Sequence, residues 1–264
     1  MTYLQFHLIF IVPPILLLMA GMGKARPALG RRGWWPVPAV MAIAFVYTTP
    51  WDNYLVWREV WWYGPDRVLG TIGWVPIEEY MFFLLQPVLT GLFTLHLVAR
   101  RKEAEGVGPA TIPGLRLEPL PSRPGLVRLA GGALWFGFAG LGAWLLTFES
   151  GVYMGLILAW ACPVLALMWL YMGHRLWRWV HVMGLAIGLP TLWLWVADTI
   201  AIRQGIWTIS PNFTLGPAPL GLPVEEAVFF LVTNVLCVMG VLLFAIPGLD
   251  SREDGEFSPG EPGR

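Results

Sequence analysis

The sequence predicts an all-α integral membrane protein with seven transmembrane helices, arranged as two three-helix repeats joined by a connecting helix. The prediction rests on an apolar composition, on seven long apolar runs and on a duplicated acidic motif. Of the 264 residues, 56% are hydrophobic and 13% are charged, whereas a soluble domain has about 25% charged residues. The formal net charge of zero provides no basic field for phosphate backbones. Soluble and nucleic-acid-binding classes are therefore excluded.

Seven apolar runs are long enough to cross the bilayer, whose hydrocarbon core is about 30 Å thick and requires about 20 residues per helix. They cover roughly residues 2–23, 34–54, 75–98, 128–148, 152–172, 178–200 and 220–246. In the first run the positive charges follow the apolar residues, which is the reverse of a signal peptide. We therefore interpret this run as a retained helix.

The distribution of Lys and Arg predicts the orientation, because cytoplasmic segments carry an excess of both. With the N-terminus outside, 14 of the 17 basic residues lie in inside segments, and only Arg58, Arg67 and Arg203 lie outside. The inverse orientation would violate this bias in nearly every loop. The sequence thus predicts a multi-pass protein of the cell membrane with a cytoplasmic C-terminus.

The predicted organisation is a single transmembrane domain followed by a short tail. The assignments are the domain at 1–247, repeat one at 1–98, a cytoplasmic linker at 99–127, the connecting helix at 128–148, repeat two at 150–247 and a disordered cytoplasmic tail at 248–264. The linker and the tail are assigned from their Pro, Gly and polar residues.

An internal repeat relates the two halves of the chain. The segment 75–84, which contains Pro-Ile-Glu-Glu followed by Phe-Phe, recurs 147 residues later at 222–231. Upstream, Asp52 ends one helix of the first copy and Asp198 ends the corresponding helix of the second. Three helices are an odd number, so the connecting helix restores the direction of the second copy. Two parallel repeats then place all their acids toward the outer face.

Six carboxylic acids are the candidate catalytic residues: Glu78, Glu79, Glu225, Glu226, Asp52 and Asp198. An ordinary alternative exists, since Pro followed by acids is a common helix start and favours the helix dipole. The duplication and the apolar residues that follow each motif favour a functional role, because ionisable groups facing a membrane interior are costly. A carboxyl that burial keeps protonated can act as a general acid.

Aromatic residues beside the acids are the candidate binding residues for an apolar substrate. They are Trp51, Trp62, Phe82, Phe83, Trp207, Phe229 and Phe230. Trp is also typical of membrane interfaces, so the tryptophans have a second possible role as anchors. Ring faces can stabilise a cation, and acids with an aromatic lining suit carbocation chemistry. The four His and two Cys show no metal-ligand spacing, so no metal site is predicted.

The Pro-x-Glu-Glu pairs at 76–79 and 223–226, each followed by Phe-Phe, resemble the paired motif of the lycopene cyclase domain. The resemblance covers residues 1–98 and 150–247 and corresponds to the membrane-integral, heterodimer-type cyclase with both halves in one chain. Trp51-Asp52 and Asp198 fit the same pattern. One departure is Arg58-Glu59-Val60-Trp61-Trp62, where the family tends to have Gly before the Trp, as at Gly205.

The resemblance implies a lycopene β-cyclase that converts the linear ψ end groups of lycopene to β-ionone rings, giving β-carotene via γ-carotene with no net redox change. It implies that the four Glu residues supply acid and base and that the two Asp residues position or polarise them. A cofactor-free enzyme is expected, because no dinucleotide fingerprint is present. Expected partners are lycopene, other linear carotenoids, membrane lipid and enzymes of the carotenoid pathway. A small 3+1+3 transporter and a non-catalytic carotenoid-binding protein are the alternatives. The residues do not distinguish one cyclised end from two.

Overall fold

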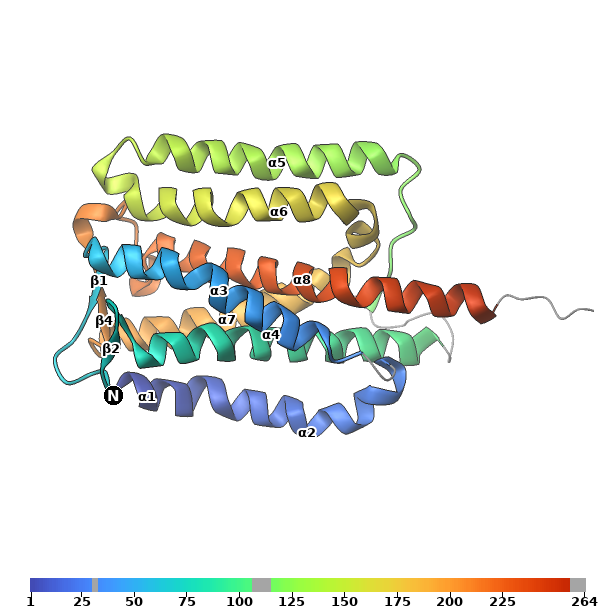
Figure 1. Ribbon diagram of the computed structural model, residues 1–264, viewed down its shortest axis with the longest axis horizontal. Helices are drawn as coiled ribbons and strands as arrows, with labels where there is room; N and C mark the ends of the chain where they lie inside the picture. The colour runs from blue at the N-terminus through green and yellow to red at the C-terminus, as the bar shows by residue number, and fades with distance from the viewer. Residues whose placement is uncertain (30–32, 106–114, 257–264) are drawn as a thin grey trace, which may run out of the picture.

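The computed structural model describes residues 1–29, 33–105 and 115–256, and these residues form a helical bundle (Figure 1). Seven long helical segments occur in this part of the chain. They are α1 (Tyr3–Phe6), η1 (His7–Ile11) and α2 (Val12–Leu29), which run on from one another, then α3 (Pro36–Trp57), α4 (Ile77–Glu105), α5 (Pro124–Leu145), α6 (Val152–Arg178), α7 (Val180–Arg203) and α8 (Val224–Glu256). The predicted all-α class is therefore confirmed for the described residues.

Short strands and turns of 3-10 helix occupy the connections at one end of the bundle. They are β1 (Trp61–Tyr63), β2 (Thr71–Ile72), β3 (Val75–Pro76), β4 (Trp207–Ile209), η3 (Glu149–Gly151), η4 (Pro211–Phe213) and η5 (Pro219–Gly221). The strands form two antiparallel pairs, β1 with β4 and β2 with β3. The β1–β4 pair joins the loop after α3 in one half of the chain to the loop after α7 in the other.

Six of the described helical segments are long and apolar enough to cross a membrane. They are Tyr3–Ala25, Ile77–Ala104, Pro124–Leu145, Glu149–Arg178, Val180–Arg203 and Val224–Ile246. The remaining predicted span, at 34–54, corresponds to α3, which is a helix of 22 residues but is not among these six. Its second half contains Thr48, Thr49, Asp52 and Asn53, which lower its apolar character.

Several boundaries differ from the predicted ones. Helix α4 continues to Glu105 and α5 begins at Pro124, so the connection is shorter than the predicted linker 99–127. Proline suits the first turn of a helix, because its missing N–H has no partner to lose there. Helix α8 extends through Glu256, although a disordered tail was predicted from residue 248. Extending an existing helix needs no new nucleus. Predictions for residues 30–32, 106–114 and 257–264 lie outside the described residues.

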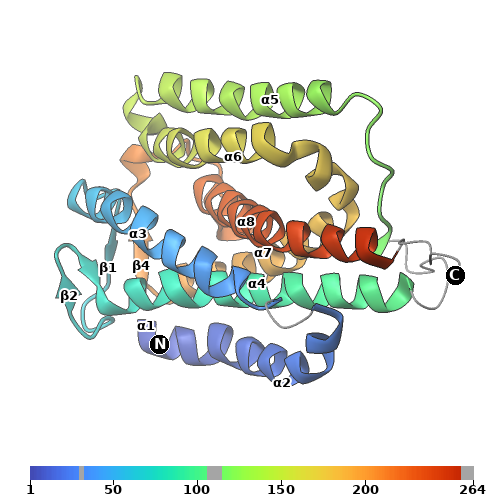
Figure 2. The ribbon, with the colours of Figure 1, turned by 45° about the vertical axis from the view of Figure 1, so that its right-hand side comes forward.

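The two helices that carry the duplicated Glu-Glu motif lie at the centre of the bundle. In the most apolar window of α4 and of α8, 61% of residues are buried, compared with 11% in α5. Helix α5 packs along α6 at the edge of the bundle (Figures 1 and 2). Helices α4 and α8 both start at the end of the bundle that holds β1 and β4. Their acidic first turns therefore lie at that end.

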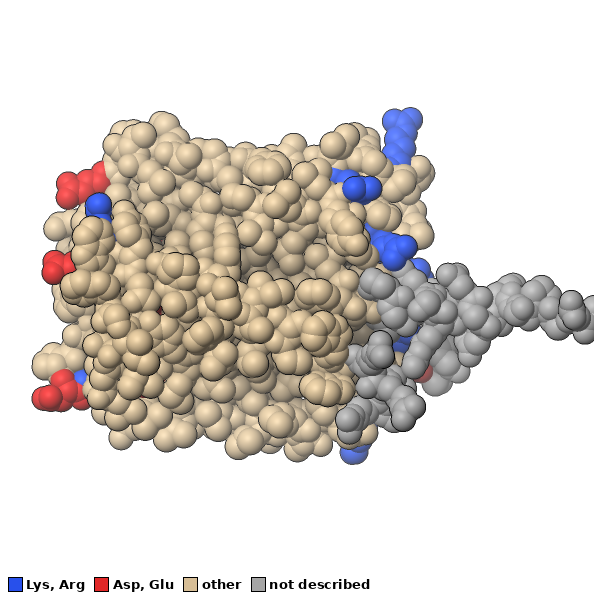
Figure 3. Space-filling view, viewed as in Figure 1, with Lys and Arg blue, Asp and Glu red and all other residues tan. Residues whose placement is uncertain are grey.

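On the face of the bundle seen in Figure 3, charged residues lie at the two ends and are separated by an uncharged belt. Acidic side chains lie at the end that holds β1 and β4, and most basic side chains of the described residues lie at the opposite end (Figure 3). A belt without charge is what a protein must present to hydrocarbon, where exposed charges are costly. Together with the six apolar helices, this distribution is that of a multi-pass membrane protein.

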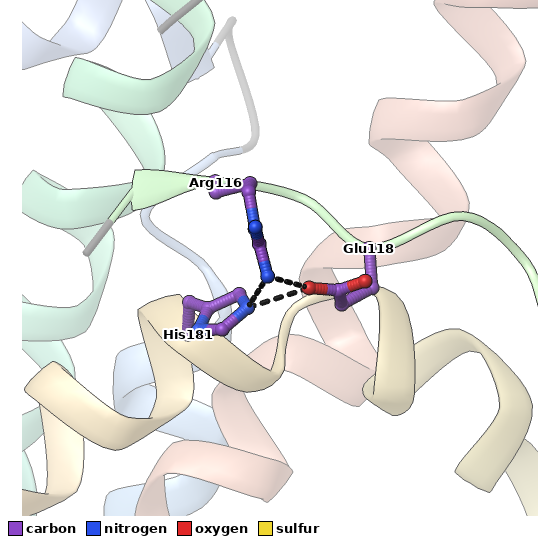
Figure 4. Close-up of polar contacts among 3 residues, drawn as sticks. All are labelled: Arg116, Glu118 and His181. Carbon is purple, nitrogen blue, oxygen red and sulfur yellow. Dashed lines mark hydrogen bonds and ion pairs between the residues drawn. The ribbon is translucent and has the colours of Figure 1, made fainter. Parts of the chain in front are cut away.

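The described end of the connection before α5 is fastened to the helices. Glu118 accepts from Arg116 at 2.5 Å, and its carboxylate lies 2.7 Å from the His181 ring at the start of α7 (Figure 4). These hydrogen bonds, first that of His181 and then that of Arg116, lower the pKa of Glu118 below its usual value. Leu115 is buried in the core nearby. The segment is thus docked against the bundle rather than free of it.

Candidate functional site

An internal cavity of about 40 Å³ lies beneath the β1–β4 pair and collects acids from both halves of the chain. It is lined by Tyr3, Phe6, Asp52, Trp61, Tyr63, Glu79, Phe82, Tyr153, Asp198, Trp207, Ile209, Glu226, Phe229 and Phe230. Four of the six predicted acids are present, from α3, α4, α7 and α8. We call this space the acid cavity. The duplicated motif thus produces one shared site in the described residues and not two separate ones.

Each central glutamate of the cavity accepts a hydrogen bond from a tyrosine near the start of another helix. The Tyr3 hydroxyl donates to Glu79 Oε2 at 2.7 Å, and the Tyr153 hydroxyl donates to Glu226 Oε1 at 2.7 Å. Tyr3 and Tyr153 are 150 residues apart, close to the 147-residue offset of the motifs. The two glutamate sites are therefore related by the internal repeat.

The symmetry fails at one position, which gives Glu79 a second donor. The Tyr63 hydroxyl donates to Glu79 Oε2 at 3.0 Å. Burial first, and then the Glu79 carboxyl, raise the pKa of Tyr63 well above its usual value, so its hydroxyl keeps its proton. Ile209 stands at the corresponding position of β4, because Tyr63 and Ile209 each lie two residues after a matching Trp. The environments of Glu79 and Glu226 therefore differ by one hydroxyl group.

The two aspartates also differ in their partners. The Trp207 indole N–H donates to Asp198 Oδ1 at 2.9 Å. The corresponding indole, that of Trp61, donates instead to the Tyr63 hydroxyl at 3.1 Å. Asp52 and Asp198 are 2% and 0% exposed, and Oδ2 of each has no hydrogen-bond partner in the structure. Both carboxyls thus retain an oxygen with hydrogen-bonding capacity in a buried setting.

No positively charged side chain is among the described residues that line the acid cavity. Four carboxylates in one buried space would each pay a large desolvation cost and would repel one another. The arrangement therefore favours carboxyls that keep a proton, held by tyrosine hydroxyls and an indole. A protonated carboxyl beside an ionised one is the pairing that general acid–base catalysis requires.

Glu78 and Glu225 occupy a different place from their neighbours in the motif. Glu78 Oε1 accepts the Leu69 backbone N–H at 2.9 Å, and Glu225 Oε1 accepts the Leu215 backbone N–H at 2.6 Å. Both side chains are fully buried, and Oε2 of each has no partner in the structure. Neither residue lines the acid cavity. Each ties the loop that precedes its helix to the first helical turn.

Six of the seven predicted aromatic residues divide among three places. Trp207, Phe82, Phe229 and Phe230 line the acid cavity, as predicted for residues close to the acids. Trp51 lies behind the cavity wall, stacked on Phe229 at 5.7 Å between ring centroids. Phe83 lines a larger apolar cavity next to the first. The prediction therefore located the aromatic region but not the role of each ring.

Trp62 does not line the acid cavity, whereas its neighbour Trp61 does. Its side chain is 44% exposed, whereas Trp61 is 7% exposed and lines the acid cavity. Successive side chains of a strand point to opposite faces. Trp61 and Trp62 follow one another in β1, so only one of them can face the acid cavity. Trp61 and Trp207 each lie nine residues after Asp52 and Asp198, a spacing that identifies the correct pair.

The same register accounts for the departure noted in the first outer loop. Counted from the aspartates, Glu59 corresponds to Gly205. Both have a left-handed backbone, with φ of 56° at Glu59 and 63° at Gly205. Glycine adopts this conformation without steric cost, whereas a residue with a Cβ does not. The loop geometry is thus kept in the first repeat although the glycine is absent.

Comparison with known proteins agrees with this duplicated site. A family model described as lycopene cyclase matches residues 1–97 and 151–246, one segment for each half of the chain. The chain belongs to the lycopene cyclase family. The two matched segments support a duplicated arrangement and leave the connecting helix α5 outside both.

Relatives of known description lie in archaea and fungi. Lycopene beta-cyclases from two strains of Halobacterium salinarum are 40% identical to the chain over 245 residues, which is 92% of this chain and 96% of each relative. A bifunctional lycopene cyclase/phytoene synthase of Leptosphaeria maculans is 37% identical over 92% of this chain and 41% of its own length. The corresponding Gibberella fujikuroi protein is 34% identical over 91% and 39%. No solved structure matches the chain.

Proposed function

We propose that this family member is a lycopene β-cyclase, which closes the ψ end groups of lycopene to β-ionone rings by a proton-initiated reaction in the acid cavity. The supporting observation is the meeting of Asp52, Glu79, Asp198 and Glu226 in one buried, aromatic-lined space. The reaction is an isomerisation, so its atoms and electrons balance without an oxidant or reductant. One proton is added to the substrate and one proton is removed from it for each ring that closes.

In the proposed reaction a protonated carboxyl delivers its proton to C2 of the terminal C1=C2 bond. The tertiary cation at C1 is attacked by the C5=C6 bond, which closes the ring and moves the positive charge to C5. A carboxylate then removes the proton from C6 to form the ring double bond. Glu79 and Glu226 are the proposed acid and base, in an order that we leave open. One proton must return from base to acid for each ring closed.

Other groups of the cavity are assigned to orientation and to stabilisation of the cation. Tyr3 and Tyr153 hold the two glutamates by the hydrogen bonds described above. The ring faces of Phe82 and Phe230 line the space in which the positive charge develops, and aromatic faces attract cations. Asp52 and Asp198 polarise the cavity with carboxyl groups that are buried beside the glutamates.

Glu78 and Glu225 are proposed as positioning residues, in contrast to the catalytic role predicted for them from the sequence. Their carboxylates hold the backbone of Leu69 and Leu215. Adjacent residues on a helix project about 100° apart, so only one member of each Glu-Glu pair can face the acid cavity. The other member of each pair fixes the loop that encloses the cavity.

We propose that the chain crosses the membrane seven times, with α3 as the span outside the six apolar helices. The two halves are then parallel repeats joined by α5, with the N-terminus outside and the C-terminus cytoplasmic. The charge distribution of Figure 3 supports this orientation through the positive-inside rule. A reporter inserted near Pro65 should be read outside the cell, and one fused after Arg264 should be read in the cytoplasm. A cytoplasmic reading at Pro65 would contradict the orientation.

Lycopene and other linear carotenoids are the proposed substrates, and no cofactor is proposed. The fungal relatives combine a lycopene cyclase with a phytoene synthase in one chain. We extend this association to the present chain as a proposed proximity to enzymes that make its linear substrate. Membrane lipid is the medium that would hold both the protein and the apolar pigment.

Expression in lycopene-accumulating bacteria, followed by chromatography of the pigments, tests the proposed activity. We expect β-carotene or γ-carotene in cells that contain the membrane-inserted protein. Unchanged lycopene beside a well-folded, membrane-inserted protein would contradict the proposal.

A further inference from the structure

A second cavity of about 620 Å³ lies beside the acid cavity, between α3, α4, α6 and α8. Its wall is dominated by aliphatic and aromatic side chains, including Ile43, Val164, Met168 and Leu236. Helix α8 lies between α3 and α6 along this side of the bundle (Figure 2). We call this space the apolar cavity. Its volume far exceeds that of the acid cavity.

The apolar cavity and the acid cavity share a wall. Phe82 and Phe229 line both spaces. Each lies three residues after a cavity glutamate, Phe82 after Glu79 and Phe229 after Glu226, so the repeat contributes one ring from α4 and one from α8 to the shared wall. The acids thus lie on one side of this wall, and the apolar cavity lies on the other.

Three of the polar side chains at the apolar cavity have partners within the protein. The Tyr47 hydroxyl donates to the Trp160 carbonyl, the Thr233 hydroxyl donates to the Phe229 carbonyl, and the Gln86 amide donates to Asn234. Among the described residues, the Trp160 indole N–H is buried without a partner. A cavity with so few polar groups free to bond offers little to a polar ligand and suits a hydrocarbon.

The mouth of the apolar cavity faces the surroundings of the bundle rather than its ends. Ile43, Tyr171 and Phe244 line the cavity and are 56%, 68% and 42% exposed. These residues belong to α3, α6 and α8, the helices that enclose the cavity, and lie within the helices and not at their ends. A ligand dissolved in the membrane can therefore reach the cavity sideways, without crossing the polar end.

We propose that the apolar cavity binds the polyene chain of the substrate, while one end group passes Phe82 and Phe229 into the acid cavity. This inference rests on the proposed function. A long hydrocarbon with a reacting end matches a long apolar cavity that leads to acids. The acid cavity, at about 40 Å³, has room for only a few water molecules. Entry of a branched end group therefore requires Phe82 and Phe229 to turn aside.

Filling the apolar cavity tests this inference. Ala44 and Val164 are half-buried residues of its wall, and a ring at either position would occupy the space assigned to the polyene. Ala44→Phe and Val164→Phe should each lower lycopene conversion per folded protein by about tenfold or more. Val46→Phe and Leu167→Phe are the matched controls, because these residues are 72% and 60% exposed and lie outside the cavity wall.

A labelling experiment keeps the test informative if the phenylalanine variants fold poorly. Ala44→Cys and Val46→Cys are small changes that place a thiol inside and outside the apolar cavity. A membrane-soluble maleimide, followed by peptide mass spectrometry, reports each thiol separately from Cys162 and Cys237. Lycopene should slow labelling at position 44 and leave position 46 unchanged.

The outcomes separate the cavity from the activity. If the unmodified protein converts no lycopene, the proposed function fails. If it converts lycopene and the cavity-filling variants do so equally well, the polyene site is wrong while the activity stands. Equal labelling of position 44 with and without lycopene would also overturn the polyene site.

Discussion

Replacing each motif glutamate by glutamine should separate chemical from structural roles. In the unmodified protein the Tyr153 hydroxyl lies 2.7 Å from Glu226 Oε1. Glu226→Gln retains a side-chain oxygen that can accept this hydrogen bond, but an amide has no acidic proton to deliver and is a poor base. The same reasoning applies to Glu79→Gln and its tyrosine donors. Both variants should therefore fold and lose turnover.

The expected loss follows from the role of a general acid or base. Removing such a group typically costs about 10²–10⁴-fold in rate, which corresponds to about 2.7–5.5 kcal/mol of activation free energy. Water is a poor substitute in a cavity of about 40 Å³ with an aromatic lining. The loss should therefore lie toward the upper part of this range.

Glu78→Gln and Glu225→Gln are the matched controls for the acid cavity. Their amide oxygens can still accept the Leu69 and Leu215 backbone N–H groups, which the carboxylates bind at 2.9 and 2.6 Å. Because this hydrogen bond can be kept, the substitution should cost about 1 kcal/mol of folding free energy and only a few-fold in turnover. The contrast is between neighbouring residues with the same substitution.

The assay is carotene formed per unit of folded protein in lipid vesicles, with folding checked by thermal unfolding. If Glu79→Gln and Glu226→Gln both keep more than about a third of normal turnover, far more than loss of an acid would leave, the catalytic assignment is wrong. If the Glu78→Gln and Glu225→Gln variants are as inactive as their neighbours, the distinction drawn from the structure is wrong.

Three further predictions test the surroundings of the acids. Tyr153→Phe should lower turnover by about tenfold or more, because Glu226 loses its tyrosine donor. Tyr63→Phe should lower turnover less, because Glu79 keeps the hydrogen bond from Tyr3. Equal losses would contradict the difference between the surroundings of the two glutamates. Trp61→Phe should reduce turnover and Trp62→Phe should not, since only Trp61 lines the acid cavity. The reverse order in the same carotene assay would contradict the placement of Trp61 at the cavity. Glu59→Gly should stabilise the fold by about 1 kcal/mol, because φ is 56° there, and an unchanged or lower unfolding temperature would show that the strain is absent.

The acids themselves could be predicted from the sequence, because the repeat displays them twice. The Pro-x-Glu-Glu motifs mark two helix starts, and Asp52 and Asp198 lie near two helix ends, each five residues before the last helical residue. Parallel repeats then require these ends to lie in one layer. What the motif does not contain is the rotation of each helix, which decides that Glu79 and Glu226 face the cavity while Glu78 and Glu225 face the loops.

The pairing of β1 with β4 could not be predicted in the same way. It joins Trp61 to Ile209 and Tyr63 to Trp207 across the two halves of the chain. Neither strand is longer than three residues, so neither shows an alternating pattern that would set its register. Arg58 and Arg203 each lie four residues before a Trp, a spacing that matches Trp62 to Trp207, whereas counting from the aspartates matches Trp61 to Trp207.

The tyrosine donors were missed for a different reason. Tyr3 and Tyr153 each stand at the start of an apolar helix, where an aromatic residue is ordinary at a membrane interface. Their hydroxyl groups gain a role only when a helix from elsewhere in the chain brings a glutamate within 2.7 Å. Their separation of 150 residues, close to the motif offset, was the one available signal.

The central claim is that carboxyls of the protein start the cyclisation by giving a proton to the substrate. The most direct measurement uses purified protein in lipid vesicles, equilibrated in D₂O, in excess over lycopene and without flavin or nicotinamide. The account predicts that lycopene is cyclised and that the first ring closed carries one deuterium at C2. A dependence of conversion on an added redox cofactor, or a new ring that contains no deuterium, would contradict it.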